Sequence, residues 1–519
     1  MVMKGSVSFK TILARWYSIP WYPILFAVYP ALALLGHNIG QVGYSVAYRA
    51  LFVSALNSVL SVFILYLVIR DWGKAGILTV LWILAFFFYG HVFGYMNGLE
   101  INGRVIGRHT YFMAVWLSLL LGIAWFTLKN SWYRALLPVL KTMSVVLAVL
   151  PLVQLASYQY SASKGTKAVP PEIPVPTLSA KPAPDIYFII LDMYGRNDVL
   201  SEQFGYDNSL FLRRLEDMGF YVASCSKSNY PSTSYSLSAT LNANYVQALS
   251  DQFTPDNGDG TLLWHFIQNS AVETLMKQHD YKIVAFETGF KWTEWEDADY
   301  YFTLRSNTIN NFEELLLRNS FPFVFTEKGY LDEYLLTADK RKRDLVLHVL
   351  KELESVPLLP APKFVFVHLT TPHPPFVVGP NGEFQVIPPH YENGEDYYLK
   401  DEYILGYKNQ VAFLNMRMPQ VLQAILEKSA QPPVIIVQGD HGPRFVENEK
   451  QLDILNAYYF PDPKPELYPS MTPVNNFRLI FNTYFGASLP LLPDESYLSD
   501  FEIPYKFTEI PNDCTPADN

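Results

Sequence analysis

The apolar positions of this chain follow one pattern before residue 157 and another after it. The first part holds five long apolar stretches, at about residues 20–37, 50–69, 76–96, 110–128 and 136–156. Each approaches the roughly 20 residues that a helix needs to cross a bilayer, and five in succession exclude a cleaved signal peptide. The pattern predicts a membrane domain over residues 1–158 with about five transmembrane helices. The alternative is a set of buried helices in a soluble protein.

Beyond a Pro/Ser-rich segment at residues 159–184, which predicts an extended linker, short apolar runs alternate with amphipathic or charged segments. The runs at 185–191, 282–286, 363–368 and 434–438 predict buried strands, and the segments at 209–218, 338–353 and 403–427 predict helices. This alternation is typical of an α/β domain with a mainly parallel central sheet. We assign that domain to residues 185–490 and a C-terminal tail to residues 491–519.

Composition supports a membrane protein and excludes other classes. Half of the 519 residues are hydrophobic and only 17% are charged, which is low for a wholly soluble chain. The formal net charge of −10 argues against a nucleic-acid partner. The only cysteines, Cys225 and Cys514, exclude a disulfide framework and a cysteine-based zinc site, and sequence does not say whether they pair.

The distribution of Lys and Arg orients the predicted helices. With the N-terminus inside, the cytoplasmic ends carry Lys4, Lys10, Arg15, Arg70, Lys74, Lys129 and Arg134. The opposite side carries Arg49, Arg104, Arg108, Lys164 and Lys167. Because basic residues favour the cytoplasmic side, this modest excess and an odd number of spans predict that everything after residue 157 lies outside the cytoplasm.

Three predicted strands end in residues that suit a metal. Asp192 follows the first strand, His368 ends the third with His373 five residues later, and Asp440 and His441 follow the fourth within Gly-Asp-His-Gly. Carboxyl ends of parallel strands meet at one edge of a sheet, and carboxylate and imidazole are ligands for Zn²⁺ or Mn²⁺. The alternative for Gly-Asp-His-Gly alone is an ordinary turn.

A run rich in hydroxyl groups, residues 229–242, leads into a predicted helix. A hydroxyl at a helix N-terminus can bind a metal, which lowers its pKa and makes it a nucleophile. The free backbone N–H groups of the first turn can stabilise an anionic group during transfer. The alternative is that Ser232 or Thr233 only caps the helix.

Together these motifs resemble the alkaline phosphatase superfamily in its sulfatase-like membrane branch, which includes lipoteichoic acid synthases and lipid A phosphoethanolamine transferases. The resemblance covers nearly the whole chain, and residues 233–238 (Thr-Ser-Tyr-Ser-Leu-Ser) are similar to the branch's Thr-Ala-Tyr-Ser-Val-Pro pattern. It implies that Thr233 is the nucleophile and that Asp192, Thr233, Asp440 and His441 hold the metal. It also implies that His373 is catalytic and contacts the transferred phosphate.

The chain departs from the superfamily at three places. Ser226 to Asn229 follow Cys225, so the Cys-X-Pro-X-Arg motif of formylglycine sulfatases is absent. His368-X-X-X-X-His373 replaces the Asp-X-X-X-His set of two-metal members, so we expect one divalent metal, Zn²⁺ or Mn²⁺. Pro443-Arg444-Phe445 differs from the usual continuation, so we expect Arg444, together with His368, to bind substrate.

The resemblance implies a multi-pass enzyme of the bacterial cytoplasmic (inner) membrane with its catalytic domain on the periplasmic side. The expected reaction transfers or hydrolyses a phospho-group of a phospholipid or cell-envelope glycan. Two alternatives stay open: hydrolysis of a phosphate or sulfate ester with water as acceptor, and a non-catalytic membrane scaffold. The loop at 287–297 is a further candidate, in which Trp292 and Trp295 either stack on substrate or belong to a partly buried loop.

Overall fold

The structure is a computed structural model that describes residues 20–40, 42–96, 100–101, 104–105, 108–165, 173–174, 184–258, 260–304, 309–325, 337–387, 390–392, 395–499 and 503–514. The chain divides into two compact units. The membrane unit comprises Met1–Ser161 and Asn307–Ala338, and the α/β unit comprises Ala162–Ser306 and Asp339–Asn519. Most of the predicted linker lies outside the described residues.

The membrane unit is helical at all five predicted stretches. Its helices are α2 (Tyr22–Asn38), α3 (Tyr48–Ile69), α4 (Trp72–Met96), α5 (His109–Lys129) and α6 (Tyr133–Gly165). A short 3-10 turn, Tyr44–Ala47, precedes α3. Two antiparallel strands of two residues each, β1 (Glu100–Ile101) and β2 (Arg104–Val105), lie between α4 and α5. Among the described residues, four spans are long and apolar enough to cross a membrane: Tyr44–Ile69, Trp72–Met96, His109–Lys129 and Tyr133–Tyr160. Helix α2 has 17 residues, at the lower end of the ~17–25 that a span needs.

A segment that lies far along the chain also belongs to the membrane unit. Helix α12 (Asn311–Arg318) and the 3-10 turn Phe321–Phe325 follow the strands of the α/β unit in sequence, yet they pack on the membrane helices. Asn310 Nδ2 donates to the carbonyl of Val46 at 3.0 Å, and a Cβ on Gly90 would lie 2.7 Å from the carbonyl of Asn319. The predicted range 185–490 placed this segment in the catalytic domain, whereas its contacts group it with the membrane helices.

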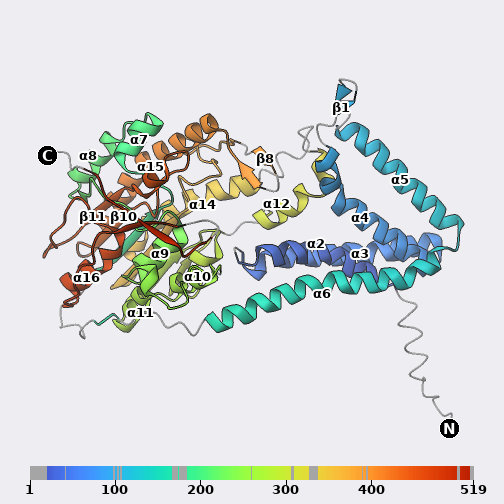
Figure 1. The fold of residues 1–519 in the computed structure, drawn as a ribbon, viewed down its shortest axis with the longest axis horizontal. Coiled ribbons are helices and arrows are strands. Elements are labelled where there is room, and N and C mark those ends of the chain that lie inside the picture. The colour runs from blue at the N-terminus through green and yellow to red at the C-terminus, as the bar shows by residue number, and fades with distance from the viewer. Residues whose placement is uncertain are drawn as a thin grey trace, which may run out of the picture. The chain divides into compact units, whose positions relative to one another are not determined.

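A seven-stranded sheet forms the centre of the α/β unit (Figure 1). Its order is β4-β11-β10-β3-β7-β5-β6. The strands are β3 (Ile186–Leu191), β4 (Tyr221–Val222), β5 (Lys282–Phe286), β6 (Tyr300–Phe302), β7 (Lys363–Leu369), β10 (Val434–Gln438) and β11 (Asn456–Tyr459). Strands β10, β3, β7, β5 and β6 pair in parallel, while β11 runs antiparallel to both neighbours. The predicted α/β fold class with a mainly parallel sheet is therefore confirmed.

Helices cover both faces of this sheet, which explains why its strands are uninterrupted apolar runs. Tyr187 and Ile189 of β3 face a core formed with α7 (Asn197–Phe204), α8 (Ser209–Asp217), α14 (Thr337–Leu353) and α15 (Lys400–Lys428). Phe188 and Ile190 face the opposite core, formed with α9 (Thr233–Leu241), α11 (Ala271–Gln278) and α16 (Asn476–Tyr484). Every residue of β3 is fully buried, so both faces are dry.

Smaller elements complete the α/β unit. Helix α10 (Thr261–Gln268) packs with the terminal hairpin β12 (Ser496–Ser499) and β13 (Phe507–Ile510) in a separate aromatic cluster, and β8 (His390–Glu392) pairs with β9 (Glu395–Tyr397). Short 3-10 turns lie at Val246–Ala248, Lys291–Thr293, Val356–Leu358, Asn448–Leu452 and Pro473–Asn475. The two cysteines form a disulfide, Cys225–Cys514, which ties the end of the chain to the segment before α9.

Candidate metal centre

The register of the parallel strands brings the predicted ligands to one edge of the sheet. His368 of β7 and Gln438 of β10 both pair with Ile190 of β3, so the residues that follow all three strands emerge side by side. The backbone N–H of Asp192 continues the ladder by donating to the carbonyl of Leu369 at 3.0 Å. This edge is where α/β proteins place their sites.

A glycine is required where β10 ends. A Cβ on Gly439 would collide with the carbonyl oxygen of Tyr194, in the turn that follows Asp192. Only a residue without a side chain lets these two backbones approach so closely. The approach places Asp440 beside that turn, where its Oδ1 accepts a hydrogen bond from the N–H of Met193 at 3.0 Å.

Asp192, Asp440 and His441 form a buried cluster. Each offers one ligand atom, and these atoms lie within 4.8 Å of one another. His441 Nε2 is 3.7 Å from Asp192 Oδ1 and 3.7 Å from Asp440 Oδ2. These separations exceed a hydrogen bond, but they approach the ~3.4 Å that separates neighbouring ligands around a tetrahedral ion with bonds of about 2.1 Å.

In the described part of the chain, the cluster contains buried carboxylate oxygens without hydrogen-bond partners, and a bound cation would satisfy them. Asp192 Oδ1 and Asp440 Oδ2 are buried without a hydrogen-bond partner, and a buried carboxylate oxygen left in this way is costly. His441 Nδ1 lies 3.0 Å from the carbonyl of its neighbour Gly442, which accepts its proton and leaves Nε2 with the lone pair. Two carboxylates and one imidazole nitrogen form a donor set that suits Zn²⁺ or Mn²⁺.

Three histidines surround Asp192. Burial alone raises the pKa of this carboxyl group, but the charges and hydrogen bonding of His373, His368 and His441 outweigh burial and lower it. His368 is buried, with Nε2 3.5 Å from Asp192 Oδ2 and Nδ1 3.3 Å from the hydroxyl of Thr293. This position allows His368 to orient Asp192, and its predicted contact with substrate stays a prediction.

His373 is held in the loop that follows β7. Its Nδ1 donates to the carbonyl of Pro374 at 2.6 Å, which in the neutral ring leaves Nε2 as an acceptor. Gln410 of α15 fixes the same loop, because its Nε2 donates to the carbonyls of Pro372 and His373 at 3.0 and 3.2 Å. Burial lowers the pKa of His373, while the charge of Asp192 opposes that shift.

The structure also brings Lys342 of α14 to the site, which the sequence did not indicate. Its Nζ donates to the carbonyl of Pro374 at 3.0 Å, the same oxygen that His373 contacts. Burial lowers the pKa of Lys342 to about 8, and the charge of Asp192 opposes the shift. In sequence Lys342 lies within Lys340-Arg341-Lys342-Arg343, and such a run of basic residues is usually a solvated helix face.

The predicted nucleophile lies at the start of α9. Thr233 is the first residue of that helix and is buried, and Ser236 lies one turn further on. Ser236 Oγ is 3.2 Å from Ser228 Oγ, which is itself 2.5 Å from the carbonyl of Asp440. Ser228 thus links the first turn of α9 to the loop that contains Asp440 and His441. The metal-binding and catalytic roles of Thr233 stay predictions.

Three candidates for substrate contact remain, and they differ in exposure. Trp292 is half-buried, with its ring centroid 6.4 Å from that of His368. Arg444 lies in the loop after β10 with an exposed side chain, and its backbone N–H donates to the hydroxyl of Tyr403 at 3.0 Å. Trp295 is almost wholly buried, with its ring stacked 4.3 Å from that of Phe366 on β7. Of the two interpretations of loop 287–297, the structure supports packing in the core for Trp295. Arg444, in the separate loop after β10, remains a candidate anion contact.

Several solved structures are similar to this chain. The C-terminal periplasmic domain of EcEptC from Escherichia coli is 14% identical, with a TM-score of 0.43 over 67% of this chain and 98% of that one. An alkaline phosphatase superfamily protein from Vibrio parahaemolyticus is 13% identical, with a TM-score of 0.36 over 66% and 82%. The integral membrane lipooligosaccharide phosphoethanolamine transferase A of Neisseria meningitidis is 12% identical, with a TM-score of 0.32 over 85% and 87%.

No protein-family model matches the chain, and no curated protein matches it. The solved structures that are similar to the chain thus include a phosphoethanolamine transferase and an alkaline phosphatase superfamily protein.

Proposed function

We propose that this chain is a membrane-anchored, metal-dependent enzyme of the alkaline phosphatase superfamily that transfers a phospho-group outside the cytoplasm. The proposed donor is a phospholipid headgroup, and the acceptor is a lipid or a cell-envelope glycan. One observation carries the proposal. The ligand atoms of Asp192, Asp440 and His441 converge within 4.8 Å at the carboxyl edge of the sheet, and Ser228 links this cluster to the helix that Thr233 begins.

The reaction would take two steps through Thr233. In the first, Thr233 Oγ attacks phosphorus, the bond to the departing alkoxide breaks, and the threonine proton ends on the leaving alcohol. In the second, an acceptor hydroxyl attacks the phosphothreonine and restores the Thr233 hydroxyl. A divalent ion held by Asp192, Asp440 and His441, with Thr233 as a further ligand, would lower the pKa of the hydroxyl and stabilise negative charge.

Three other groups of this chain would assist. His373 offers Nε2 to accept and return a proton or, when protonated, to donate to a phosphate oxygen. Lys342 adds a positive charge near the same loop. Backbone N–H groups of the first turn of α9 favour an anion through the helix dipole, in a site where low solvent access strengthens each interaction.

The proposed location rests on the helices and the disulfide. Four helices long enough to cross a membrane precede the α/β unit. Cys225–Cys514 joins two positions within the α/β unit, and disulfides persist in oxidising compartments such as the bacterial periplasm. Both features support an inner-membrane protein whose catalytic unit faces the periplasm.

Hydrolysis is the second candidate reaction. Arg444 is exposed in the loop that follows Asp440 and His441. The same nucleophile would serve a phosphate or sulfate ester, with water rather than an alcohol as the final acceptor. Transfer and hydrolysis differ in whether product accumulates without an added acceptor. A scaffold without activity is disfavoured, because Asp192, Thr233, Asp440 and His441 are all present.

The decisive experiment is the mass of the proteolytic peptide that carries Thr233, from protein purified out of its native membrane and quenched in acid. We expect an adduct that contains phosphate and is lost in Thr233→Ala. Its extra mass distinguishes ethanolamine phosphate, glycerophosphate and bare phosphate. Ser234→Ala is the matched control, since Ser234 is the next hydroxyl of the same helix, and it should keep the adduct.

Two results would contradict the proposal. An adduct that persists in Thr233→Ala would assign the nucleophile elsewhere. If the wild type gave neither an adduct nor turnover of added phosphodiesters while retaining its metal, phospho-group transfer would be excluded in favour of the other candidates.

A further inference from the structure

The loop at 287–297 contributes no group to the proposed reaction, yet it reaches the carboxyl edge of the sheet. The ring of Trp295 stacks 4.3 Å from that of Phe366 on β7, and Thr293 Oγ1 lies 3.3 Å from Nδ1 of His368 on the same strand. Side chains on a strand alternate between its faces, so Phe366 and His368 share one face. The loop therefore runs along that face and brings Thr293 against a histidine of the site.

A carboxylate inside the loop holds its shape. Glu294 Oε1 accepts hydrogen bonds from the backbone N–H groups of Thr288 and Gly289 at 3.1 and 2.8 Å. Glu294 Oε2 accepts a third from the hydroxyl of Tyr301 on β6. Hydrogen bonds to a charged group are the strong ones, so three of them restrict the positions that the neighbouring Thr293 can take.

Two threonine side chains form a pair beside His368. Thr288 and Thr293 are 5% and 0% exposed, and their hydroxyl oxygens are 2.8 Å apart. The backbone N–H of Phe290 donates to Thr288 Oγ1 at 3.1 Å, and its carbonyl is a possible acceptor 3.2 Å from both hydroxyl oxygens. Each hydroxyl has one proton. If Thr288 donates to Thr293, the proton of Thr293 is available for Nδ1 of His368.

The carboxylate of Asp192 selects this direction. Nε2 of His368 is 3.5 Å from Asp192 Oδ2 and has no hydrogen-bond partner of normal geometry within the described residues. An ionised carboxylate only accepts hydrogen bonds, so it attracts a protonated Nε2 and repels a lone pair. In the neutral ring, a proton on Nε2 leaves the lone pair on Nδ1. That nitrogen then needs a donor, which the hydroxyl of Thr293 supplies.

The two oxygens of Asp192 consequently have different neighbours. Oδ2 faces His368, whereas Oδ1 is 3.7 Å from Nε2 of His441 and is buried without a hydrogen-bond partner among the described residues. A donor that binds one oxygen fixes the rotation of the carboxylate and leaves the other oxygen for a cation. Partners that orient a ligand in this way are worth about 10–100-fold in metal affinity.

We infer that Thr293 is a positioning residue for the metal centre. Its hydroxyl donates to Nδ1 of His368, Nε2 of His368 presents its proton to Asp192 Oδ2, and Asp192 Oδ1 is thereby aimed at the ion. Thr288 sets the direction by donating to Thr293. The inference rests on the proposed function only for its metal, because the hydrogen bonds themselves belong to the metal-free chain and can be measured there.

Metal affinity is the first readout. The full chain in nanodiscs is stripped with a chelator and titrated with zinc against a competing fluorescent chelator. Thr293→Val keeps the shape of the side chain but loses the hydroxyl, so we expect zinc affinity to fall by about 10–100-fold. Thr293→Ser keeps the donor and should restore the affinity.

Thr472→Val is the matched control. Thr472 is also fully buried, and its hydroxyl donates to Asp494 Oδ1 at 2.8 Å, so its loss removes a comparable hydrogen bond elsewhere in the α/β unit. Zinc affinity should be unchanged in this variant. Equal affinities of the wild type and Thr293→Val would overturn the inference, and so would an equal loss in Thr472→Val, which would indicate general destabilisation.

The tautomer of His368 is the second readout, and it needs neither metal nor turnover. Nitrogen NMR of the metal-free full chain in lipid bilayers, labelled with ¹⁵N-histidine, distinguishes protonated from unprotonated ring nitrogens, and His368→Gln identifies the signals. We expect the proton on Nε2 in the wild type and a mixture of both neutral tautomers in Thr293→Val. A wild type with the proton on Nδ1, or on both nitrogens, would overturn the inference even if Thr293→Val failed to fold.

The two readouts separate this inference from the proposed function. If the tautomer and the zinc affinities are as expected but no phosphodiester is turned over, the role of Thr293 is supported and the proposed reaction fails. If turnover is present but the wild-type tautomer is the opposite one, the reaction stands and the role of Thr293 is excluded.

Discussion

The membrane unit and the α/β unit use the same apolar residue types in opposite ways. In the membrane unit, Phe52, Val68 and Leu121 are 68%, 78% and 71% exposed. In the α/β unit, strands β3 and β7 bury every residue. The two units differ in the solvent that each surface meets, because hydrocarbon accepts a leucine side chain that water rejects. Exposure of an apolar side chain therefore has opposite meanings in the two units.

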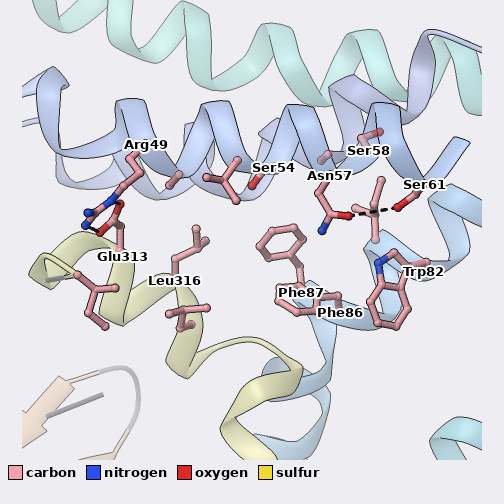
Figure 2. A pocket seen from close by; sticks show the side chains of 16 residues that line it. Arg49, Ser54, Asn57, Ser58, Ser61, Trp82, Phe86, Phe87, Glu313 and Leu316 are labelled. Carbon is pink, nitrogen blue, oxygen red and sulfur yellow. Dashed lines mark hydrogen bonds and ion pairs between the residues drawn. The ribbon is translucent and has the colours of Figure 1, made fainter. Parts of the chain in front are cut away.

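Polar groups show the same reversal. In the membrane unit, Ser54, Asn57, Ser58 and Ser61 of α3 line a cavity (Figure 2), where their polar groups escape the hydrocarbon. In the described part of the α/β unit, the carboxyl edge of the sheet gathers carboxylates, histidines and a lysine. Polar groups placed against the local solvent preference therefore need a ligand or an ion pair to satisfy them.

The largest expected effect comes from a substitution at the carboxyl edge of the sheet. Asp440→Asn removes one of two carboxylates from the cluster, so we expect loss of stoichiometric metal and a fall in kcat/KM of at least about 10²-fold, since even outer-shell partners of a metal cost about 10–100-fold. Metal analysis of the purified protein and turnover of a phosphodiester measure the two losses. Metal retained at one equivalent would remove Asp440 from the site and weaken the contrast between the two units.

A second cluster of buried charges in the α/β unit tests the free energy of unfolding rather than the reaction. Asp453 lies 3.1 Å from Arg196 Nη1 and 2.9 Å from Lys227 Nζ, and all three side chains are buried. Asp453→Ala leaves Lys227 buried without its carboxylate, whereas Arg196 keeps its pair with Asp198 at 2.8 Å. Because a buried cation is left unpaired, the free energy of unfolding should fall by about 3–5 kcal/mol.

An exposed ion pair provides the control for this change. Asp297→Ala breaks the contact with Lys277 at 3.2 Å, and the expected loss is only about 0–1 kcal/mol. Thermal and denaturant unfolding of the full chain in detergent compares the two variants. Equal losses would show that burial does not decide the value of these pairs.

Paired substitutions to arginine test the two surfaces directly. Leu121 on α5 and Leu210 on α8 are 71% and 56% exposed, but in different units. Leu121→Arg should cost about 2.5–3.5 kcal/mol of membrane insertion, if it lies near the centre of the bilayer. Leu210→Arg should change stability by less than about 0.5 kcal/mol. An insertion assay and an unfolding assay measure these effects, and a harmless Leu121→Arg would argue against a lipid-facing surface on α5.

The last prediction concerns the dependence of activity on pH. Burial lowers the pKa of Lys342 to about 8, so its positive charge is present below that pH and is lost above it. Activity should fall as pH rises through about 8, and Lys342→Arg should lack this fall because arginine keeps its charge. Lys342→Met should lower kcat/KM by about 10–10²-fold at pH 7, with metal content unchanged.

Stability should respond to the same group with the opposite sign. The unfolded chain binds this proton up to the ordinary lysine pKa, whereas the folded chain releases it near pH 8, so the contribution to stability rises with pH between those values. This rise should be absent from Lys342→Met. A pH-rate profile that is identical in the wild type and in Lys342→Arg would place the charge of Lys342 outside the reaction.

The sequence alone determined the elements whose signals are local. The five apolar stretches, the four buried strands and the helices between them all follow from the period and length of their apolar runs. It also predicted that Asp192, Asp440 and His441 would meet, because parallel strands share one carboxyl edge. These inferences needed no knowledge of contacts between distant segments.

Only the tertiary structure decided the contacts that join distant segments. Packing grouped α12 with the membrane helices, although its sequence is that of an ordinary amphipathic helix. It paired Cys225 with Cys514 across 289 residues. It also brought Lys342, one of four adjacent basic residues, to the carboxyl edge of the sheet. Trp295 belongs to the hydrophobic core, because its ring stacks on that of Phe366. Such contacts form where complementary surfaces bury apolar area and pair buried charges. No local period or motif of the sequence predicts them, because they depend on segments far apart in the chain.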